Sequence, residues 1–388
     1  MGIINFQTGT FQFHVDPNFN YQLNRAVILS NGSIDEIQNI AAKIVDIPTW
    51  IKELQALADS AKKEHREENA LAYIRAAEFF MNESNPNKET FYREYKELYY
   101  KVHDSLIVSN DIKRYNVPYD NGFLPVCCAT PEKECLGIIL IHGGFDSYME
   151  DFLPLLIFYK QLGFSVYLFE GPGQGECRHT HNLPFTPDWH RPIGAVLDYF
   201  NLDNVALIGI SLGSMLALRA AAYEKRIERV VAWTVMENFF DVILSTRPKA
   251  IRNVINMLIK TRAKGIINIL ASVMIQKEPY VAWGIEQGKY VFGKQSAYDF
   301  LTEIKKYNLK SISDSITQDV LILGAANDHF IPLSMYKEQI DCLTKARSLT
   351  FRIFTQKENA ENHCNIGNMP LVLNTIAHWI CPGGLDHD

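Results

Sequence analysis

A serine flanked by glycines is the first residue whose type and surroundings suit nucleophilic chemistry. The sequence GISLGS at residues 209–214 continues from the apolar stretch VALIG and leads into SMLALRAAAYEKR, which has a helical composition. A strand, a tight turn and a helix in this order would present the serine hydroxyl at the carboxyl edge of a sheet. The helix N-terminus would favour negative charge there, and the glycines would allow close backbone contact. Ser211 is therefore the candidate nucleophile.

The residues that would activate this serine come later in the chain. A serine hydroxyl is a weak nucleophile until a base accepts its proton. Asp328 follows the apolar run VLILGAAN, so a strand there would place it at the same sheet edge as Ser211. His363 lies in the loop after the next predicted strand, SLTFRIFTQ. Asp328 would orient His363 and stabilise its imidazolium, and His363 would be the general base.

A second histidine and a polar loop offer alternative chemistry. His329 is adjacent to the predicted acid and can hardly accept its orienting hydrogen bond. The loop TQKENAENHCNIGN also contains Glu358, Glu361 and Cys364, which are potential metal ligands or, for the thiol, a nucleophile. No complementary histidine cluster accompanies the carboxylates, and the thiol has no strand–turn–helix context of its own. We therefore expect neither a metal nor a cofactor.

A glycine pair near the middle of the chain is the candidate for stabilising an oxyanion. In LIHGGFDSYMED, residues 140–151, an apolar run ends in two glycines. The backbone N–H groups of Gly144 or Phe145, together with that of Leu212, would face the oxyanion that forms when the serine attacks a carbonyl. Each donor of this kind typically lowers a barrier by about 3–4 kcal/mol.

The elements that must position these residues form a repeating strand–helix pattern. Apolar runs such as CLGIILIH, FSVYLFE, RVVAWTV and QDVLILG alternate with helical stretches. This alternation predicts an α/β fold with a mostly parallel sheet that carries helices on both faces. An N-terminal helical region, the first part of the α/β core, a helical cap and the second part of the core are predicted at residues 1–115, 116–240, 241–316 and 317–388.

The helical insertion between the two parts of the core is expected to cover the active site. It interrupts the strand series, which resumes at DVLILGA. It contains the aromatic residues Tyr280, Trp283, Tyr290 and Phe292, which suit a flat aromatic ligand or pack as ordinary core. Tyr280 and Trp283 are candidate substrate contacts, with ordinary packing as the alternative for each.

Composition limits the classes of partner. The 388 residues carry a net charge of −6 and are 47% hydrophobic, so neither nucleic acid nor a membrane surface is expected as a partner. No apolar stretch is long enough to span a bilayer, and the first residues lack the basic start of a secretory signal. Seven scattered cysteines without metal-ligand spacing fit a reducing compartment. We expect a cytoplasmic protein that acts on a small molecule.

Four motifs, taken in order, resemble the α/β-hydrolase superfamily. They are HGGFDSYMED, FEGPGQGE, GISLGS, and GAANDHF followed by AENHC. FEGPGQGE, WGIEQGKYVFG and YIRAAEFF are similar to the branch of 2,6-dihydroxypseudooxynicotine hydrolase and the hydrolases that shorten aromatic polyketides. The resemblance covers nearly the whole chain. It implies an α/β-hydrolase core, a triad at Ser211, Asp328 and His363 under a helical cap, and a dimer through the N-terminal helices.

The resemblance also implies an acidic residue after the strand that follows the serine turn. Glu237 and Asp241, in VMENFFDV, both stand at that place. The sequence does not choose between them, and linkage of the core to the cap is the alternative role for each.

The function implied is hydrolysis of a carbon–carbon bond, a retro-Claisen cleavage, in a β-diketone-like aromatic polyketide. The substrate would be a small molecule, free or bound to a carrier, and an acyl-enzyme at Ser211 would shorten its chain. An ester or thioester hydrolase with the same three residues is the main alternative. A non-catalytic protein that uses this fold to bind a ligand is a more distant one.

Overall fold

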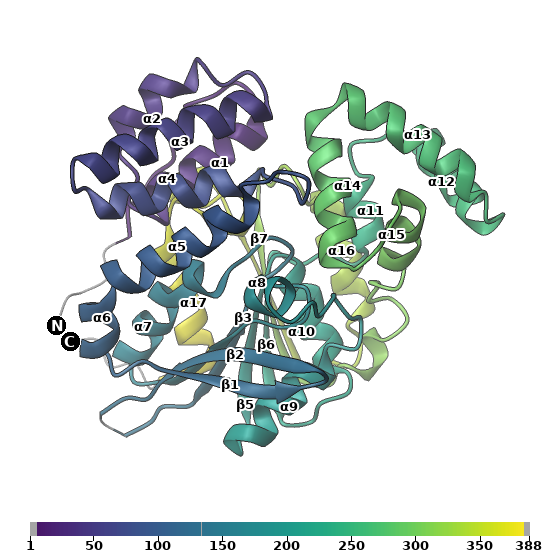
Figure 1. Ribbon diagram of the computed structural model, residues 1–388. Helices are drawn as coiled ribbons and strands as arrows, with labels where there is room; N and C mark the ends of the chain where they lie inside the picture. Colours follow the sequence, from purple (N-terminus) through teal and green to yellow (C-terminus); the bar gives the residue numbers. More distant parts are fainter. Residues whose placement is uncertain (1–5, 133, 384–388) are drawn as a thin grey trace.

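An eight-stranded mixed sheet runs through the computed structural model, which describes residues 6–132 and 134–383 (Figure 1). The strand order is β1-β2-β4-β3-β5-β6-β7-β8. The pairs from β4 to β8 are parallel, whereas β1 with β2 and β2 with β4 are antiparallel. The strands are β1 Lys113–Tyr119, β2 Gly122–Ala129, β3 Ile138–His142, β4 Ser165–Phe169, β5 Val205–Ile210, β6 Ile227–Trp233, β7 Asp319–Ala325 and β8 Ser348–Phe354.

Successive residues of the central strands face two different hydrophobic cores. Ile139 and Ile141 of β3 face one core, together with the helices α7 (Leu153–Gln161) and α17 (Met369–Ile380). Leu140 faces the other core, with α9 (His190–Phe200), α10 (Leu212–Ala221) and α16 (Leu333–Cys342). Since side chains of a strand alternate between the faces of a sheet, continuous apolar runs are required. The predicted fold class is confirmed.

The antiparallel hairpin at the sheet edge was not among the predicted strands. β1 is exposed along most of its length and includes Lys113, Arg114 and Asn116, so it lacks the apolar run that marks the parallel strands. The turn between β1 and β2 contains Asp120 with a φ of 47°. An Asp-Asn-Gly turn between extended segments is a hairpin signal, and it is the feature that would have predicted this pair.

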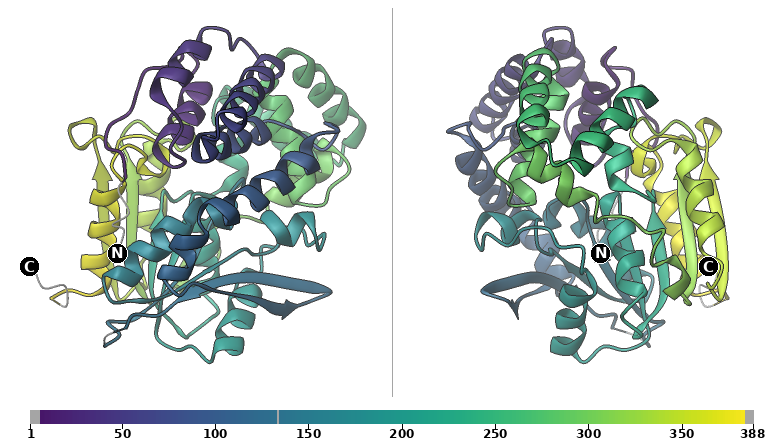
Figure 2. Two further views of the ribbon diagram at one scale, coloured as in Figure 1. Left: turned by 60° about the vertical axis from the view of Figure 1, so that its left-hand side comes forward. Right: turned by 90° about the vertical axis from the view of Figure 1, so that its right-hand side faces the viewer.

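Two groups of helices lie side by side beyond one end of the sheet (Figure 2). Within the part of the chain that the structure describes, six α-helices precede β1, and five α-helices lie between β6 and β7. The division of the chain into four regions remains an interpretation of the sequence. The first group is α1 Pro17–Ile28, α2 Ile34–Ala41, α3 Ile47–Lys63, α4 Glu67–Phe79, α5 Lys88–Val102 and α6 Asp104–Ser109; the second is α11 Phe239–Ile243, α12 Lys249–Lys260, α13 Lys264–Lys277, α14 Pro279–Val291 and α15 Ala297–Ile304.

Aromatic side chains join the two helix groups. Trp283 of α14 stacks on Phe79 of α4 with ring centroids 5.0 Å apart, and its indole N–H donates to the Phe79 carbonyl at 2.9 Å. Tyr280 packs against Phe19 and Phe80, with centroids 5.0 and 5.7 Å away. These contacts attach the inserted helices to the N-terminal helices. Within the described residues, no helix has both the length and the apolarity needed to cross a bilayer.

A buried charge network attaches α4 to the loop after β3. The Arg75 guanidinium donates to both carboxylate oxygens of Asp151, at 3.1 and 2.9 Å, and to the backbone carbonyl of Asp146 at 2.9 Å. It also pairs with Glu78 at 3.0 Å, and its side chain is only 8% exposed. A charge removed from water needs such partners, so Arg75 ties the N-terminal helices to the core.

Replacing Arg75→Met is expected to lower the free energy of unfolding by about 3–5 kcal/mol, because it removes a cationic partner from the two buried carboxylates of Glu78 and Asp151. The measurement is urea unfolding followed by tryptophan fluorescence. The matched control is Arg93→Met, because the Arg93 side chain is 71% exposed and pairs only with Glu89; its stability should stay close to that of the parent. Equal losses in the two variants would contradict a structural role for the buried network.

Candidate active site

Ser211 occupies a strained turn between β5 and α10. Its φ of 57° and ψ of −125° lie outside the ordinary regions for a residue with a side chain. Its N–H donates to the Trp233 carbonyl at 3.0 Å, and its carbonyl accepts from the Ser214 hydroxyl at 2.6 Å. Strain of this kind persists where the surroundings fix the backbone, and here it directs the Ser211 side chain out of the turn.

The glycines of the turn are required by close backbone contact. A Cβ on Gly209 would lie 2.1 Å from the Gly213 carbonyl oxygen, and one on Gly213 would lie 2.3 Å from the Gly143 oxygen. Gly144 is equally confined, because a Cβ there would be 2.8 Å from the Leu212 nitrogen. The turn at Ser211 and the loop after β3 are therefore in direct contact.

The structure brings Ser211, His363 and Asp328 together in one hydrogen-bonded series. His363 Nδ1 donates to Asp328 Oδ2 at 2.7 Å, and His363 Nε2 accepts from Ser211 Oγ at 2.9 Å. The other oxygen of Asp328 accepts the backbone N–H groups of Phe330 and Ile331 at 2.8 and 3.0 Å. The Asp328 side chain is fully buried and that of His363 is 8% exposed. This arrangement fits a nucleophile, a base and an orienting acid.

The charge of Asp328 controls the basicity of His363. Burial lowers the pKa of His363, but the Asp328 charge and hydrogen bond act against it, and the pKa lies well above its usual 6.5. Burial, with a smaller contribution from the charge of His363, lowers the pKa of His329 to about 4. His329 packs on Phe330 and Tyr21, so the described contacts do not make this rival base a partner of Ser211.

Of the three backbone N–H groups predicted to bind an oxyanion, those of Leu212 and Phe145 are not taken up by another acceptor in the described structure. Leu212 is the first residue of α10, and a helix leaves the N–H of its first residue without an intrahelical acceptor. The Gly144 N–H donates to the Ser147 hydroxyl at 3.0 Å. Among the described residues, no acceptor takes up the N–H of Phe145. The geometry therefore favours Leu212 with Phe145 as donors, while Gly144 provides the close approach.

Residues that the sequence analysis had not selected hold the loop after β3. The Gln174 amide donates to the carbonyls of Gly143 and Gly144 at 2.7 and 3.2 Å. His142 Nε2 accepts the indole N–H of Trp189 at 3.2 Å, so its Nδ1 carries the proton and donates to the Gly143 carbonyl at 3.0 Å. Gln174 belongs to the FEGPGQGE motif, which had marked the family without indicating a role.

Glu170 of the same motif fixes the loop further along. Its carboxylate accepts the N–H groups of Met149 and Glu176 at 2.8 and 2.7 Å. Burial, and then the charge of Glu150, raise the pKa of Glu170 to about 7. A side chain on Gly175 would collide with this carboxylate. The glycines and acidic residues of FEGPGQGE therefore hold the loop that carries the candidate oxyanion donors.

The amides around His363 have structural partners. Asn365 is fully buried; it accepts the Trp233 indole N–H at 2.9 Å and donates to two backbone carbonyls, including that of Ala360 at 2.7 Å. Asn368 caps α17 through the Leu371 N–H and donates to the Glu358 carbonyl at 2.8 Å. These bonds satisfy the turns of the loop and fix the backbone on both sides of the base.

Tyr21 of the N-terminal region also reaches the base. Its hydroxyl donates to the His363 carbonyl at 3.2 Å, and its ring lies 5.9 Å from the imidazole. Burial raises the pKa of Tyr21 well above its ordinary value, so the hydroxyl keeps its proton. Tyr21 lies 342 residues from His363 in the sequence, and no motif indicated this contact.

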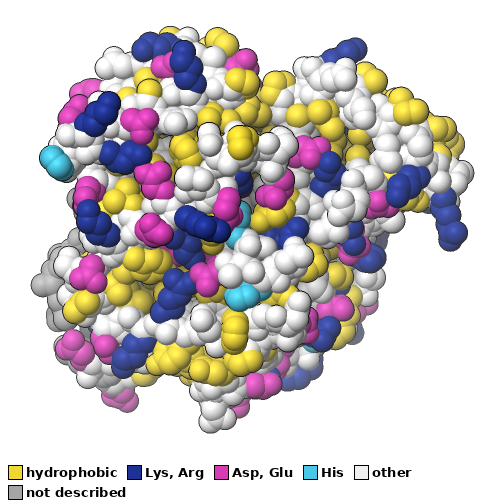
Figure 3. Space-filling model, viewed as in Figure 1, with side chains coloured by type: hydrophobic (Ala, Val, Ile, Leu, Met, Phe, Trp, Pro, Cys, Tyr) yellow, Lys and Arg dark blue, Asp and Glu magenta, His cyan; other side chains and the backbone are white. Residues whose placement is uncertain are grey.

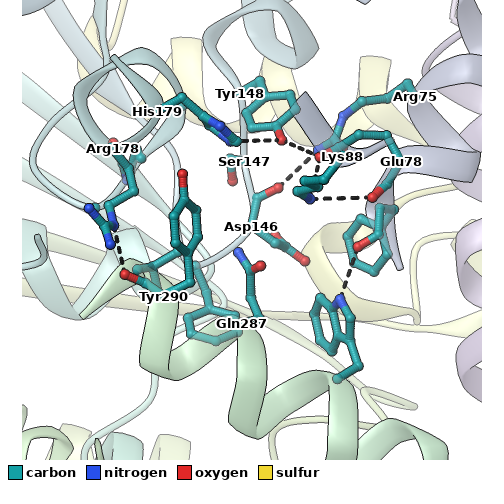
Figure 4. A pocket seen from close by; sticks show the side chains of 17 residues that line it. Arg75, Glu78, Lys88, Asp146, Ser147, Tyr148, Arg178, His179, Gln287 and Tyr290 are labelled. Carbon is teal, nitrogen blue, oxygen red and sulfur yellow. Dashed lines mark hydrogen bonds and ion pairs between the residues drawn. The ribbon is translucent and has the colours of Figure 1, made fainter. Parts of the chain in front are cut away.

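Two cavities with shared lining residues lie near the loop after β3, and Figure 4 shows the inner of the two. The inner cavity of about 20 Å³ has Phe145, Ser147 and Trp283 among its lining residues. The outer cavity of about 420 Å³ shares Lys88, Arg178, His179 and Tyr290 with the inner one. Phe145 is among the lining residues of the inner cavity, whereas Ser211 is not among those of either cavity.

The candidate substrate contacts occupy different places. Trp283 lines the inner cavity, whereas Tyr280 packs against Phe19 and Phe80. Glu237 is buried after β6, and its carbonyl accepts the Leu309 N–H at 2.9 Å. Burial, and then the charge of Glu338, raise the pKa of Glu237. The phenol of Tyr280 and the carboxyl groups of Glu237 and Asp241 do not line either of the two described cavities. A substrate role for these three residues therefore stays a prediction.

Metal and thiol chemistry were weighed for the same region. Among the described residues, no group of three or more His, Cys, Asp and Glu side chains is placed to hold a metal ion. Glu358 accepts the Thr355 N–H at 3.0 Å and pairs with Arg352 at 3.1 Å. Cys364 adopts a left-handed φ of 52° beside the base, and all seven cysteines are free.

Comparison with known proteins identifies the family. The model of the α/β hydrolase fold family matches residues 138–356, which is more than half of the 388 residues. The chain belongs to this family, and the superfamily predicted from the four motifs is confirmed.

Similar proteins carry hydrolase names. The 20-hydroxy-prefusarin hydrolase FUS2 of Gibberella moniliformis is 27% identical over 360 residues, covering 84% of each chain. Hydrolase LUC6 of Fusarium sp is 26% identical over 306 residues, covering 71% of this chain and 70% of that one. The protein is accordingly a hydrolase of the α/β fold.

Solved structures share the fold over almost the whole chain. That of 2,6-dihydroxy-pseudo-oxynicotine hydrolase superposes with a TM-score of 0.66 at 19% identity, covering 92% of this chain and 94% of that one. AbyA5 superposes with a TM-score of 0.66 at 16% identity, covering 93% and 94%. The likeness therefore includes the N-terminal helices and the helical insertion as well as the sheet.

Replacing Asp328→Asn should change the pH profile of kcat/KM in a defined direction. His363 must be neutral to accept a proton, so activity falls as the pH drops through its pKa. Without the carboxylate charge that pKa falls, and the acidic limb of the profile moves to lower pH. The maximum rate should also drop by roughly 10⁴-fold, because an amide does not hold the required tautomer. Asp341→Asn, at a 59% exposed side chain of α16, is the control; an unmoved acidic limb in the first variant would contradict the assignment.

Replacing Tyr21→Phe tests whether the N-terminal helices position the base. Loss of the hydroxyl frees the His363 carbonyl, and we expect kcat to fall by about tenfold while KM stays nearly unchanged. The comparison variant is Tyr199→Phe at a half-exposed site on α9. A general loss of stability would lower the fraction of active protein without shifting the pH profile of kcat. Unfolding curves and pH profiles are therefore measured together for both variants. Unchanged kcat would remove Tyr21 from the site.

Proposed function

We propose that this protein is a serine hydrolase that cleaves a carbon–carbon bond in a β-diketone-like aromatic compound. The observation that carries the proposal is the hydrogen-bonded series from Ser211 Oγ through His363 to Asp328, at 2.9 and 2.7 Å. Beside it, the N–H groups of Leu212 and Phe145 are available to an oxyanion. The resemblance of the motifs to the branch of 2,6-dihydroxypseudooxynicotine hydrolase supports the choice of bond.

The proposed reaction begins at the substrate ketone. His363 Nε2 accepts the Ser211 proton as Oγ bonds to the carbonyl carbon, and the resulting oxyanion lies at the Leu212 and Phe145 amides. When the carbonyl re-forms, the neighbouring carbon–carbon bond breaks. Its electron pair passes into the second carbonyl as an enolate, which the His363 imidazolium protonates. Water, activated by His363, then releases the acyl group from Ser211 as a carboxylic acid.

The raised pKa of His363 suits the first half of this cycle. A base whose imidazolium is stabilised by Asp328 accepts the serine proton more readily. The same imidazolium is then the acid closest to the departing carbanion. An enolate is a much poorer leaving group than a phenol or thiol, so protonation during bond cleavage is of greater value for the carbon–carbon substrate.

The two cavities provide the proposed approach for an aromatic substrate. The outer cavity of about 420 Å³ has the size of a small-molecule site, whereas the inner one of about 20 Å³ holds little more than a water molecule. Figure 4 shows the Gln287 amide and the Tyr290 hydroxyl directed into the inner cavity from α14. A flat ring would enter between these groups when the Phe145 ring moves aside.

An ester or thioester hydrolase is the second candidate. The Ser211, His363 and Asp328 set and the two amides serve acyl transfer from oxygen or sulfur equally well. The distinction lies in the leaving group, and a comparison of substrates with one acyl group and different leaving groups decides it.

The test offers the purified protein an aromatic β-diketone and an aryl ester with the same acyl group. We expect the diketone to give a carboxylic acid and a methyl ketone, and Ser211→Ala to lower its turnover by roughly 10⁵–10⁶-fold. Ser109→Ala, at an exposed site on α6, is the control. Mass spectrometry of the parent protein, quenched with acid during turnover, should show the acyl group on Ser211. Turnover of the ester alone would refute carbon–carbon cleavage, and unchanged turnover in Ser211→Ala would refute the serine mechanism.

A further inference from the structure

Two helices of the insertion expose an unusual amount of apolar surface. We call α12 and α13, residues 249–277, the cap arm. Seven of the 17 exposed large hydrophobic residues of the described chain belong to it, with exposed fractions between 44% and 66%. On α12 they are Ile251, Val254 and Met257, and on α13 they are Ile266, Ile269, Leu270 and Val273. Isolated exposed residues are normal, but a cluster of this kind marks a contact surface.

The spacing of these residues places them on one side of each helix. On α13 the exposed positions follow i, i+3, i+4 and i+7, which lie along one face of a helix. The buried Ile267 and Ala271 occupy an adjacent face and attach α13 to the protein. On α12 the buried Leu258 and Ile259 lie near the end of the helix. The exposed stripes are therefore additional to the apolar surface that the fold already uses.

The cap arm and the segment before it are basic. Residues 242–277, which comprise the arm and the seven residues that precede it, contain seven Lys or Arg and no Asp or Glu. Subtracting these seven charges from the net charge of −6 leaves −13 for the rest of the protein. A strongly cationic segment on an otherwise anionic protein attracts negatively charged partners to that segment.

Most of these cations have no acidic partner. Arg247 pairs with Glu278, and Lys264 pairs with Asp299 at 3.0 Å. Among the described residues, no carboxylate lies within ion-pair distance of the other five, which are Lys249, Arg252, Lys260, Arg262 and Lys277. They flank the apolar stripes, at the start of α12, at the turn between the helices and at the end of α13.

The arm lies at the periphery of the molecule, away from the N-terminal helices (Figure 1). Hydrophobic and basic side chains gather over it in the space-filling view (Figure 3). α14, which follows the arm directly, carries Trp283, Gln287 and Tyr290 to the inner cavity. A surface that binds the arm would therefore lie close to the helix that lines the candidate site.

Three kinds of occupant were compared by chemistry. A second copy of the chain, meeting arm to arm, would bring two cationic segments together, and that repulsion is only partly screened at physiological salt. Protein partners favour aromatic anchors at the centre of an interface, whereas none of the seven exposed hydrophobic residues of the arm is aromatic and six are aliphatic. Aliphatic stripes flanked by Lys and Arg are the pattern of a helix that lies in the surface of an anionic bilayer.

We propose that the cap arm docks on an anionic lipid surface. The aliphatic stripes enter the boundary between headgroups and acyl chains, and the flanking cations contact lipid phosphates. This binding departs from the expectation, drawn from the net charge alone, that no membrane surface is a partner. Delivery of an apolar substrate from the bilayer to the cavity beside α14 would follow; that consequence, but not the docking, rests on the proposed function.

The test is flotation of the full chain with vesicles of phosphatidylcholine, with and without about 30% phosphatidylglycerol. We expect recovery with the anionic vesicles to exceed that with the neutral ones by at least about tenfold, and to fall as salt rises from about 0.05 to 0.5 M. Ile269→Gln with Leu270→Gln should abolish flotation. Lys260→Gln with Arg262→Gln should weaken it and reduce its dependence on salt.

Matched controls separate this surface from general effects. Val108→Gln removes an aliphatic residue of similar exposure from α6, and Lys52→Gln removes an exposed cation from α3; both should float like the parent. Melting temperatures confirm that each variant is folded, and turnover of a water-soluble aryl ester should be unchanged in all of them. Ester turnover thus reports the proposed function separately from docking.

Three results would overturn the proposal. The first is absence of flotation with the anionic vesicles, and the second is equal flotation with neutral ones. The third is a dimer, seen by light scattering at micromolar concentration, that Ile269→Gln with Leu270→Gln dissociates while no variant or parent binds vesicles. That result would assign the surface to self-association.

Discussion

The direct contact between two backbone segments is the constraint on which the candidate site depends. The turn at Ser211 and the Gly143–Gly144 loop approach so closely that a Cβ on Gly144 would lie 2.8 Å from the Leu212 nitrogen. Only this approach places amides from both segments around one position beside the serine. Ser211, in this turn, has a strained φ of 57°, and such strain persists only where surrounding contacts fix it. Much of the nearby polar structure serves to hold these two segments.

Each of the holding contacts comes from a different element. Gln174 binds the loop carbonyls from the segment after β4, His142 binds one of them from the end of β3, and Glu170 takes up amides on both sides. Arg75 adds a contact from α4 to the Asp146 carbonyl, and Tyr21 holds the backbone of the base from α1. The N-terminal helices are therefore part of the support of the site.

The sequence by itself determined the candidate nucleophile, acid and base, because each is marked by local context. Ser211 lies between a buried strand and a helix, Asp328 follows a buried strand, and His363 follows the next one. Parallel strands bring such positions to one sheet edge whatever the details of packing. The continuous apolar runs likewise determined the parallel sheet, since both of its faces are covered. The polar β1 strand was not predicted, because it is largely exposed and lacks a continuous apolar run.

Only the tertiary structure decided which groups support that edge. Tyr21 and His363 are 342 residues apart, and Trp233 reaches Asn365 across 132 residues, so no local pattern records either contact. The same holds for the aromatic residues of the insertion, where Trp283 lines a cavity and Tyr280 packs into the N-terminal helices. In the loop TQKENAENHCNIGN, Asn365 and Asn368 bind backbone carbonyls, and Asn365 also accepts the Trp233 indole N–H. The periodicity of the local sequence determines which residues lie on each face of a helix or strand. The residues that each face contacts are determined by long-range packing.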